Sequence, residues 1–230
     1  MIKKLMLTAM VLALAVPGAQ AGLLGYYYNM SQTHPDMQSG ITGLQTGWVE
    51  NALTGAMPTL TPAGAANINQ FDWWDASSPD VFAAFSRVDS DADLNGGFAS
   101  SWYPIPNSLL GDPYHFAVHW TGSFYVDANQ IYNYQMGSDD DSWLFIDDDL
   151  KLDLGGVHGT TMTNDNVFLS QGWHDIDIFF AERHTVQSGF RLNFFSDLEP
   201  PDPVPEPATM FLLGSGLVGG ALIRRRRKKK

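Results

Sequence analysis

The sequence predicts an all-β fold of antiparallel strands arranged as a sandwich or barrel. Large apolar residues alternate with small or polar ones in short runs, glycine and proline interrupt the chain between these runs, and a long helical period is missing. One run places Ile176, Ile178 and Phe180 on one side of a strand, with Asp175 and Asp177 on the other. Alternation with period two is typical of strands with one buried face, and several such strands at short spacing form packed or closed sheets.

The alternating runs follow one another through the second half of the chain. Turn residues separate them, and Asp147-Asp148-Asp149 stands where a tight hairpin turn is expected. An earlier segment, residues 81–85, is predicted to form a short helix. The predicted strands cover residues 116–120, 124–126, 131–134, 143–146, 150–154, 173–180 and 190–194.

Charge and composition exclude several classes of function. All 25 acidic residues lie between Asp36 and Glu206, a segment with only four basic residues, so its formal charge is 4 − 25 = −21. A segment this acidic repels nucleic acid, whose phosphates require a basic surface. The chain has no cysteine, which excludes a disulfide scaffold, a cysteine-ligated metal and a cysteine nucleophile.

Residues 1–21 are predicted to be a secretory signal peptide, which signal peptidase removes. Lys3 and Lys4 supply the positive charge at its start, an apolar stretch follows, and alanines at positions 19 and 21 suit the cleavage site. The exported β domain is then expected to span residues 22–196.

The chain ends in three segments of different composition. Residues 197–208 form a stiff, proline-rich linker. Residues 209–223 carry no charge, and as a helix they would span ~22 Å, somewhat less than the ~30 Å hydrocarbon layer of a membrane. The basic run 224–230 holds this end on the cytoplasmic side. The domain is therefore expected to be exported while its tail stays anchored in the membrane, at least for a time.

The tail resembles the PEP-CTERM sorting signal, which combines a Pro-Glu-Pro motif, a Gly-containing transmembrane helix and an Arg-rich end. The matching motif is Val204-Pro205-Glu206-Pro207, and the resembling segment spans residues 204–230. The resemblance implies recognition by an exosortase, a membrane-embedded cysteine protease, in a Gram-negative bacterium that makes exopolysaccharide and biofilm matrix. A permanent tail anchor is the alternative interpretation of these residues.

Several segments of the domain resemble PA14-like domains, and more closely their fibro-slime subfamily. The most specific pair is residues 134–153, which contain SDDDSWLFID, and residues 154–158, LGGVH. The resemblance implies a β-sandwich or barrel of the kind found in adhesins, glycosidases, toxins and signalling proteins, several of which bind carbohydrate. The other resembling segments are residues 25–29 (GYYYN), 34–37 (HPDM), 98–107 (FASSWYPIPN) and 179–184 (FFAERH).

In adhesins of this superfamily, two neighbouring aspartates hold a calcium ion that binds sugar hydroxyls. The resemblance places this role among Asp139, Asp140 and Asp141, with the assignment open by one residue. Carboxylate oxygens are ligands that calcium prefers. As an alternative, these side chains cap backbone N–H groups of a turn. A second acidic stretch, residues 89–97, begins like a calcium loop but lacks its glycine and its final acid, which favours an ordinary loop.

Two further pairs of residues invite a functional interpretation. Trp73 and Trp74 are adjacent in a polar loop, and neighbouring side chains of an extended segment face opposite ways. One ring is therefore expected to be exposed and to stack on a glycan, unless loops cover both rings. Glu182 and Arg183 are expected to form a structural ion pair at a strand end.

The sequence thus predicts a non-enzymatic protein at the cell surface or in the extracellular matrix. It is expected to bind exopolysaccharide or another glycan, with calcium as its cofactor. A purely structural matrix protein is the alternative. A glycan-processing hydrolase is disfavoured, because two of the four glutamates lie in the tail and no catalytic motif emerges. His158 and His184 are interpreted as structural residues.

Overall fold

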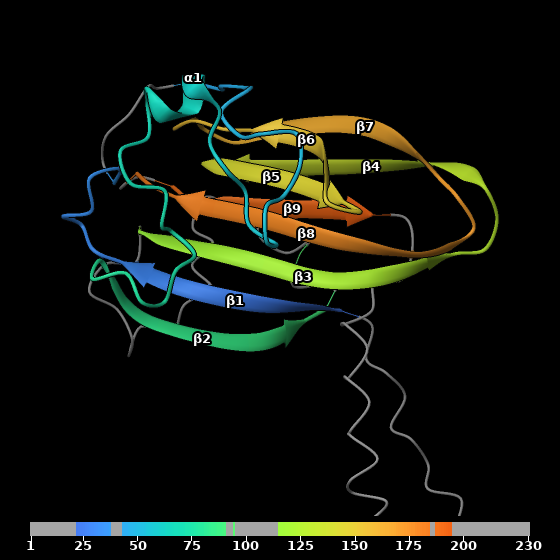
Figure 1. Cartoon of the computed structure of the whole chain (residues 1–230), viewed down its shortest axis with the longest axis horizontal. Helices are drawn as coiled ribbons and strands as arrows, with labels where there is room; N and C mark the ends of the chain where they lie inside the picture. Colours follow the sequence, from blue (N-terminus) through green and yellow to red (C-terminus); the bar gives the residue numbers. More distant parts are fainter. Residues whose placement is uncertain (1–21, 38–42, 91–93, 95–114, 185–186, 195–230) are drawn as a thin grey trace, which may run out of the picture. The chain divides into compact units, whose positions relative to one another are not determined.

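The computed structural model describes residues 22–37, 43–90, 94, 115–184 and 187–194, and these residues form two antiparallel β-sheets (Figure 1). One sheet has six strands in the order β2-β1-β3-β8-β5-β6, and the other has three in the order β7-β4-β9. The predicted all-β sandwich is therefore confirmed. The elements are β1 (Leu23–Met30), α1 (Pro62–Ala65), β2 (Val81–Asp89), β3 (Phe116–Val126), β4 (Gln130–Asp139), β5 (Asp141–Ile146), β6 (Asp149–Leu154), β7 (Thr161–Leu169), β8 (Gly172–Glu182) and β9 (Gly189–Phe194).

Two strands differ from the sequence prediction. The predicted helix over residues 81–85 is wrong, because this segment belongs to β2, which pairs with β1 along its length. The ring of Phe85 stacks on the ring of Tyr27 from β1, with centroids 4.9 Å apart, so tertiary packing decides the conformation. Strand β7 was not predicted, because its sequence TMTNDNVFL is mostly polar.

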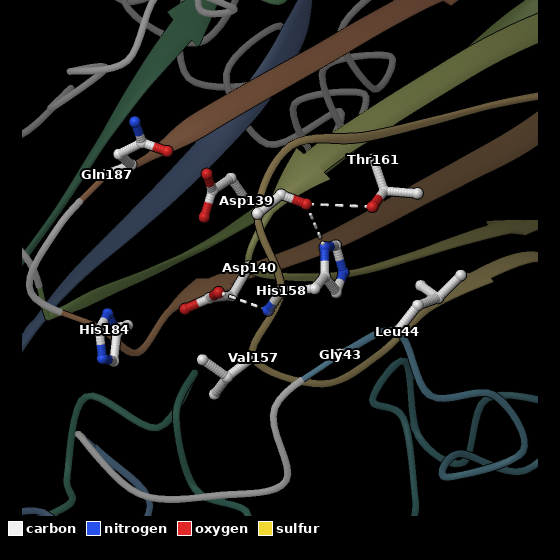
Figure 2. Close-up of a pocket in the computed structure, with 10 residues that line it drawn as sticks. Gly43, Leu44, Asp139, Asp140, Val157, His158, Thr161, His184 and Gln187 are labelled. Carbon is white, nitrogen blue, oxygen red and sulfur yellow. Dashed lines mark hydrogen bonds between the residues drawn. The ribbon is translucent and has the colours of Figure 1, made fainter.

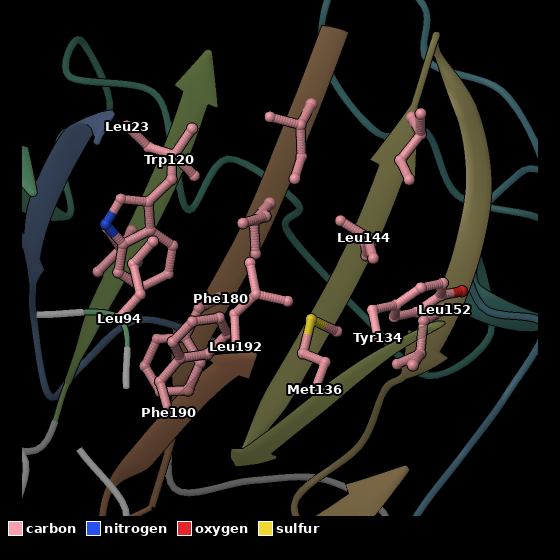
Figure 3. Packing of buried hydrophobic residues seen from close by; sticks show 14 of the residues in the cluster. Leu23, Leu94, Trp120, Tyr134, Met136, Leu144, Leu152, Phe180, Phe190 and Leu192 are labelled. Carbon is pink, nitrogen blue, oxygen red and sulfur yellow. The ribbon is translucent and has the colours of Figure 1, made fainter. Parts of the chain in front are cut away.

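The main hydrophobic core lies between the two sheets, and it takes side chains from both of them (Figure 3). Phe180 of β8 is fully buried there, and its ring lies 5.6 Å from the rings of both Phe116 and Phe190. Met136 and Leu192 enter the same core from the three-stranded sheet. The apolar face predicted for residues 176–180 is therefore the face that packs against the second sheet.

A second core covers the opposite face of the six-stranded sheet. The long connection between β1 and β2 crosses this face and places Trp73 and Trp74 against Trp143 and Phe179. Every residue of β5 is buried, because one face of the strand meets the main core and the other meets this aromatic layer. This burial on two sides explains why the sequence of β5 lacks a polar alternation.

The hairpin between β5 and β6 turns at Asp147 and Asp148. Both residues have positive φ, 52° and 65°, as the two central residues of a type I′ turn require. Aspartate tolerates this conformation better than most side chains. The turn predicted at these acidic residues is confirmed.

The predicted terminal segments lie outside the described residues, as does the fibro-slime-like segment 98–107. This holds for the signal peptide, the proline-rich linker, the helix over residues 209–223 and the basic tail. Among the residues that the structure does describe, no helix is long and apolar enough to cross a membrane.

Phe180→Ala should lower the free energy of unfolding by about 3–5 kcal/mol, because it removes a fully buried ring and leaves a cavity between the sheets. Phe82→Ala is the matched control, because the Phe82 side chain is 61% exposed and its loss should change stability by about 0.5 kcal/mol or less. Urea denaturation measures both changes. Equal destabilisation by the two variants would contradict the assigned core.

Candidate functional site

A pocket opens where β4 and β8 end and β5 begins (Figure 2). Its volume is about 510 Å³, which is typical of small-molecule sites. The end of β4, the loop before β7, the segment after β8 and residues 43–44 supply its walls. The pocket therefore gathers segments that are far apart in the sequence.

Three acidic side chains meet beside this pocket: Asp139 and Asp140 line it, and Glu182 lies next to them. Each offers one carboxylate oxygen, and these oxygens lie within 4.8 Å of one another. Asp139 ends β4 in one sheet and Glu182 ends β8 in the other, while Asp140 lies between β4 and β5, joined to Asp139 by a cis peptide bond. All three residues are buried, with exposed fractions of 5%, 1% and 0% in the order Asp139, Asp140, Glu182.

Asp141 does not join this group, although the sequence places it beside the other two aspartates. Its carboxylate accepts hydrogen bonds from Nε and Nη2 of Arg183, at 2.7 and 3.1 Å. Both side chains are buried. The structure thus takes Asp141 out of the predicted set and puts Glu182 in its place. The expected pair of Glu182 with Arg183 is wrong, because successive residues at a strand end point in opposite directions.

Backbone N–H groups donate to each of the three acids, but none of them reaches the buried Oε2 of Glu182. Thr160 donates its backbone N–H to Asp139, and Asp140 accepts the backbone N–H groups of His158 and Arg183. Glu182 accepts the backbone N–H of His184 on Oε1 (3.0 Å). Among the described residues, no N–H or hydroxyl group donates to the buried Oε2 of Glu182, and the side chain that interacts with this carboxyl group is another acid, Asp140. A buried oxygen of this kind is unusual and fits a cation site.

The electrostatics of the group favour protons or a cation on these acids. Burial, followed by the charges of Asp141 and Asp139, raises the pKa of Asp140 to about 7. Burial and then the charge of Asp140 raise the pKa of Glu182 far above its usual range. Burial also raises the pKa of Asp139, against the hydrogen bonds from Thr160. Ionisation of these acids is therefore less favourable in the folded protein than in water.

The LGGVH segment closes around the aspartates. Gly156 donates its backbone N–H to Asp141 and His158 donates its own to Asp140, so the two motifs that looked most specific in the sequence contact each other. Gly156 has a φ of +98°, and a Cβ there would lie 2.6 Å from the carbonyl oxygen of Gly43. Only glycine fits this position without a shift of the backbone.

Trp73 and Trp74 are both buried, with 0% and 4% exposure, so the prediction of an exposed ring for glycan stacking is wrong. Trp73 donates from its indole to Asp36 of the HPDM segment, and its ring lies 4.9 Å from the Arg183 guanidinium carbon. Trp74 donates to the carbonyl oxygen of Val118. The alternative interpretation, that loops cover both rings, is the one that the structure shows.

Asp89, the first residue of the second acidic stretch, lies in a separate polar cluster. Its buried carboxylate accepts hydrogen bonds from the indole of Trp120 (2.8 Å), from Arg87 (2.6 Å) and from the hydroxyl of Tyr27. These bonds give Asp89, the last residue of β2, a structural role. Asp91 and Asp93 lie outside the described residues.

A comparison with protein-family models matches residues 20–203 to the PA14 domain. The chain belongs to the PA14 family. The predicted resemblance is thereby confirmed, and the fibro-slime-like psi proteins of Dictyostelium discoideum are relatives of this PA14 protein. Protein psiD is 36% identical over 110 residues, which are 46% of this chain and 21% of psiD, and protein psiJ is 36% identical over 102 residues, 41% of this chain and 14% of psiJ. The PA14 protein thus spans less than a quarter of the length of these relatives.

Solved PA14 domains are similar to this PA14 protein at low sequence identity. The PA14 domain of the MpAFP antifreeze protein is 14% identical with a TM-score of 0.48, covering 84% of this chain and 97% of that one. A PA14 sugar-binding domain from an RTX adhesin is 15% identical with a TM-score of 0.47, covering 77% of this chain and 91% of that one.

The tail of the PA14 protein also matches a family model. Residues 203–227 match the PEP-CTERM protein-sorting motif. This motif implies exosortase processing and indicates export to the surface of a bacterium, so the coarser prediction for the C-terminus is confirmed.

Arg183→Met should lower the free energy of unfolding by about 3–5 kcal/mol, because it leaves the Asp141 charge buried without a partner. The double variant Arg183→Met/Asp141→Leu should recover much of this loss, since neither charge remains. Urea unfolding in a chelator measures the cycle. A double variant no more stable than Arg183→Met would contradict the assigned pair.

In a chelator, the stability of the native protein should fall relative to Asp140→Asn as the pH rises from about 4 to about 7. The folded-state pKa of Asp140 lies above its unfolded value, so the folded state binds more protons in this window and loses stability as they dissociate. Urea midpoints at pH 4, 5, 6, 7 and 8 measure the difference. A difference that stays constant with pH would contradict the raised pKa.

Proposed function

We propose that this exported PA14 protein binds glycans through a calcium ion held by Asp139, Asp140 and Glu182. The observation that carries the proposal is the buried group of three carboxylates beside an open pocket, with Glu182 Oε2 lacking a hydrogen-bond donor. Calcium supplies positive charge to this site, and its open coordination positions bind sugar hydroxyls.

The chemistry of the donor set supports calcium as the cation. Calcium takes about 6–8 oxygen ligands, and the three side chains offer only some of them, which leaves positions for ligand hydroxyls and water. The acids must lose their protons to bind the ion, and the raised pKa of Asp140 makes binding tighter as the pH rises. Cysteine and free thiolate are absent from the chain, which disfavours soft metals.

Export to the cell surface suits a calcium site of low affinity, as in other extracellular modules. Extracellular calcium modules bind with dissociation constants of about 10⁻⁴–10⁻³ M, which suits a site whose ligands are partly protonated when empty. The match to the sorting motif supports export of the domain to the cell surface, where a matrix polysaccharide would be within its reach. We therefore infer that the natural ligand is a polysaccharide of the matrix around a Gram-negative host cell.

The same carboxylates raise the question of a glycan hydrolase, since catalytic acids also have raised pKa values. Retaining glycosidases hold their two carboxyl groups about 5–5.5 Å apart and inverting ones about 6.5–9.5 Å apart. In the PA14 protein, oxygens of all three acids lie within 4.8 Å of one another, a spacing that one cation spans. Because one cation spans the three oxygens and the sequence carries no catalytic motif, we propose binding rather than hydrolysis.

We propose that the helix over residues 209–223 anchors the protein only until exosortase cuts within the sorting segment 204–230. The PEP-CTERM match supports this order of events. Intact mass of protein recovered from the cell surface would show the loss of both the signal peptide and the tail, whereas a full-length C-terminus would indicate a permanent anchor.

Calcium at 100 times its dissociation constant should stabilise the native protein by ~2.7 kcal/mol and raise its melting temperature. Glu182→Gln should lose this response, because it removes one of the three carboxylates. Asp127→Asn is the matched control, since Asp127 is exposed and lies between β3 and β4, at the opposite end of β4 from Asp139, and it should respond as the native protein does. Equal melting temperatures of the native protein in calcium and in chelator would contradict the cation site.

Binding to isolated host exopolysaccharide and to a glycan array should require calcium and should be lost in Asp140→Asn. The Asp127→Asn control should bind like the native protein. A glycan retained equally by the native protein and by Asp140→Asn would show that the pocket is not the calcium-dependent site.

A further inference from the structure

The outer face of the three-stranded sheet carries an unusual set of polar side chains, remote from the acids of the pocket. Along β4, Tyr132, Tyr134 and Met136 pack toward the main core, so Asn133 and Gln135 point to the opposite face. Amide side chains of β7 and β9 stand beside them. We name this set the amide face; its members are Asn133, Gln135, Asn164, Asn166 and Asn193.

Strand register arranges the amide face in two rows. Gln135 is paired with Asn164 on one side and with Asn193 on the other, so one row crosses all three strands. Asn133 is paired with Asn166 in the next row. The Gln135 amide donates to the Asn164 carbonyl at 2.7 Å. These side chains line a shallow groove of about 290 Å³.

An apolar pair continues the surface beyond the second row. Ile131 of β4 is paired with Phe168 of β7, and their side chains are 62% and 65% exposed. A sugar ring presents hydroxyl groups at its edge and C–H groups on its faces. Amides offer a donor and an acceptor to each hydroxyl, and the Phe168 ring offers a flat apolar surface to the C–H groups.

Charge selects among the polymers that this surface can bind. The five amides are neutral, within a segment whose formal charge is −21. The charged neighbours are Asp165, which lines the groove, and Arg191, which lies one row beyond Gln135 on β9. An acidic polysaccharide or a nucleic acid is repelled by the surrounding charge, whereas a neutral polysaccharide is not.

We infer that the amide face, with Ile131 and Phe168, is a second glycan-binding surface that takes a neutral polysaccharide chain without calcium. It does not depend on the cation site proposed above. Asp139 follows Gln135 by four residues along β4, a distance of about 13 Å at ~3.3 Å per residue. A long chain can therefore contact both surfaces, which raises the overall affinity for polymers over single sugars.

Affinity electrophoresis of the full chain in EDTA tests this inference, with gels containing dextran, galactomannan, hydroxyethyl cellulose or the acidic polymer alginate. At least one neutral polysaccharide should retard the native protein and the Glu182→Gln variant equally. Asn133→Ala/Asn166→Ala should weaken this binding about tenfold or more, since two neutral hydrogen-bonding groups are lost. Asn51→Ala is the matched control, because Asn51 is an exposed amide outside the face.

The inference would be overturned by the absence of retardation of the native protein by every neutral polymer, by stronger retardation by alginate, or by equal retardation of the amide variant and the Asn51→Ala control. Sedimentation of the native protein as a dimer that the amide variant dissociates would assign the face to a second copy instead. Should the double variant not fold, Phe168→Ala tests the same surface, and undiminished binding by it would count against the inference. The Glu182→Gln variant should lose calcium-dependent glycan binding and keep the binding that persists in EDTA. This result would show that the cation site and the amide face bind independently.

Discussion

The buried pair of Asp141 and Arg183 is the interaction on which the site depends. Two hydrogen bonds join the carboxylate to the guanidinium at the end of the six-stranded sheet, with no exposed surface on either side chain beyond 1%. The guanidinium also packs on the ring of Trp73 and donates to the carbonyl oxygen of Asp36, 3.4 Å away. The Arg183 guanidinium thus joins β5, the end of β8 and the loop layer to one another. Removing any one of its partners would destabilise the protein, because the charge would stay buried without full compensation.

The same pair leaves the charges of the neighbouring acids only partly compensated by the described side chains. Arg183 directs its charged group toward Asp141, while Asp140 receives only its backbone N–H. Asp139, Asp140 and Glu182 are consequently buried together with raised pKa values. Burial of like charges is costly in a folded protein, and such an arrangement persists where protons or a bound cation offset it. The acids beside the pocket are therefore stable in the fold when protons or a cation neutralise their charge.

Strand β4 connects the two surfaces to which we assign function. Its residues Ile131, Asn133 and Gln135 share the outward face, Tyr132, Tyr134 and Met136 pack into the main core, and Asp139 ends the strand beside the other buried acids. Burial of Tyr134 and Met136 holds the register, and the register in turn fixes which side chains of β7 and β9 lie beside Asn133 and Gln135. The core thus sets the geometry of a surface that contributes nothing to the core itself.

The sequence by itself determined the antiparallel β class, the hairpin at Asp147 and Asp148, the family motifs and the sorting segment, because alternation, turn residues and short motifs are local properties of the chain. Tertiary structure decided the rest. It brought Glu182 to the two aspartates, turned Asp141 to Arg183, covered Trp73 and Trp74, and made a strand of residues 81–85. The amide rows belong to this second group. Each of these outcomes depends on which distant strands pair and in what register, and no local pattern contains that information.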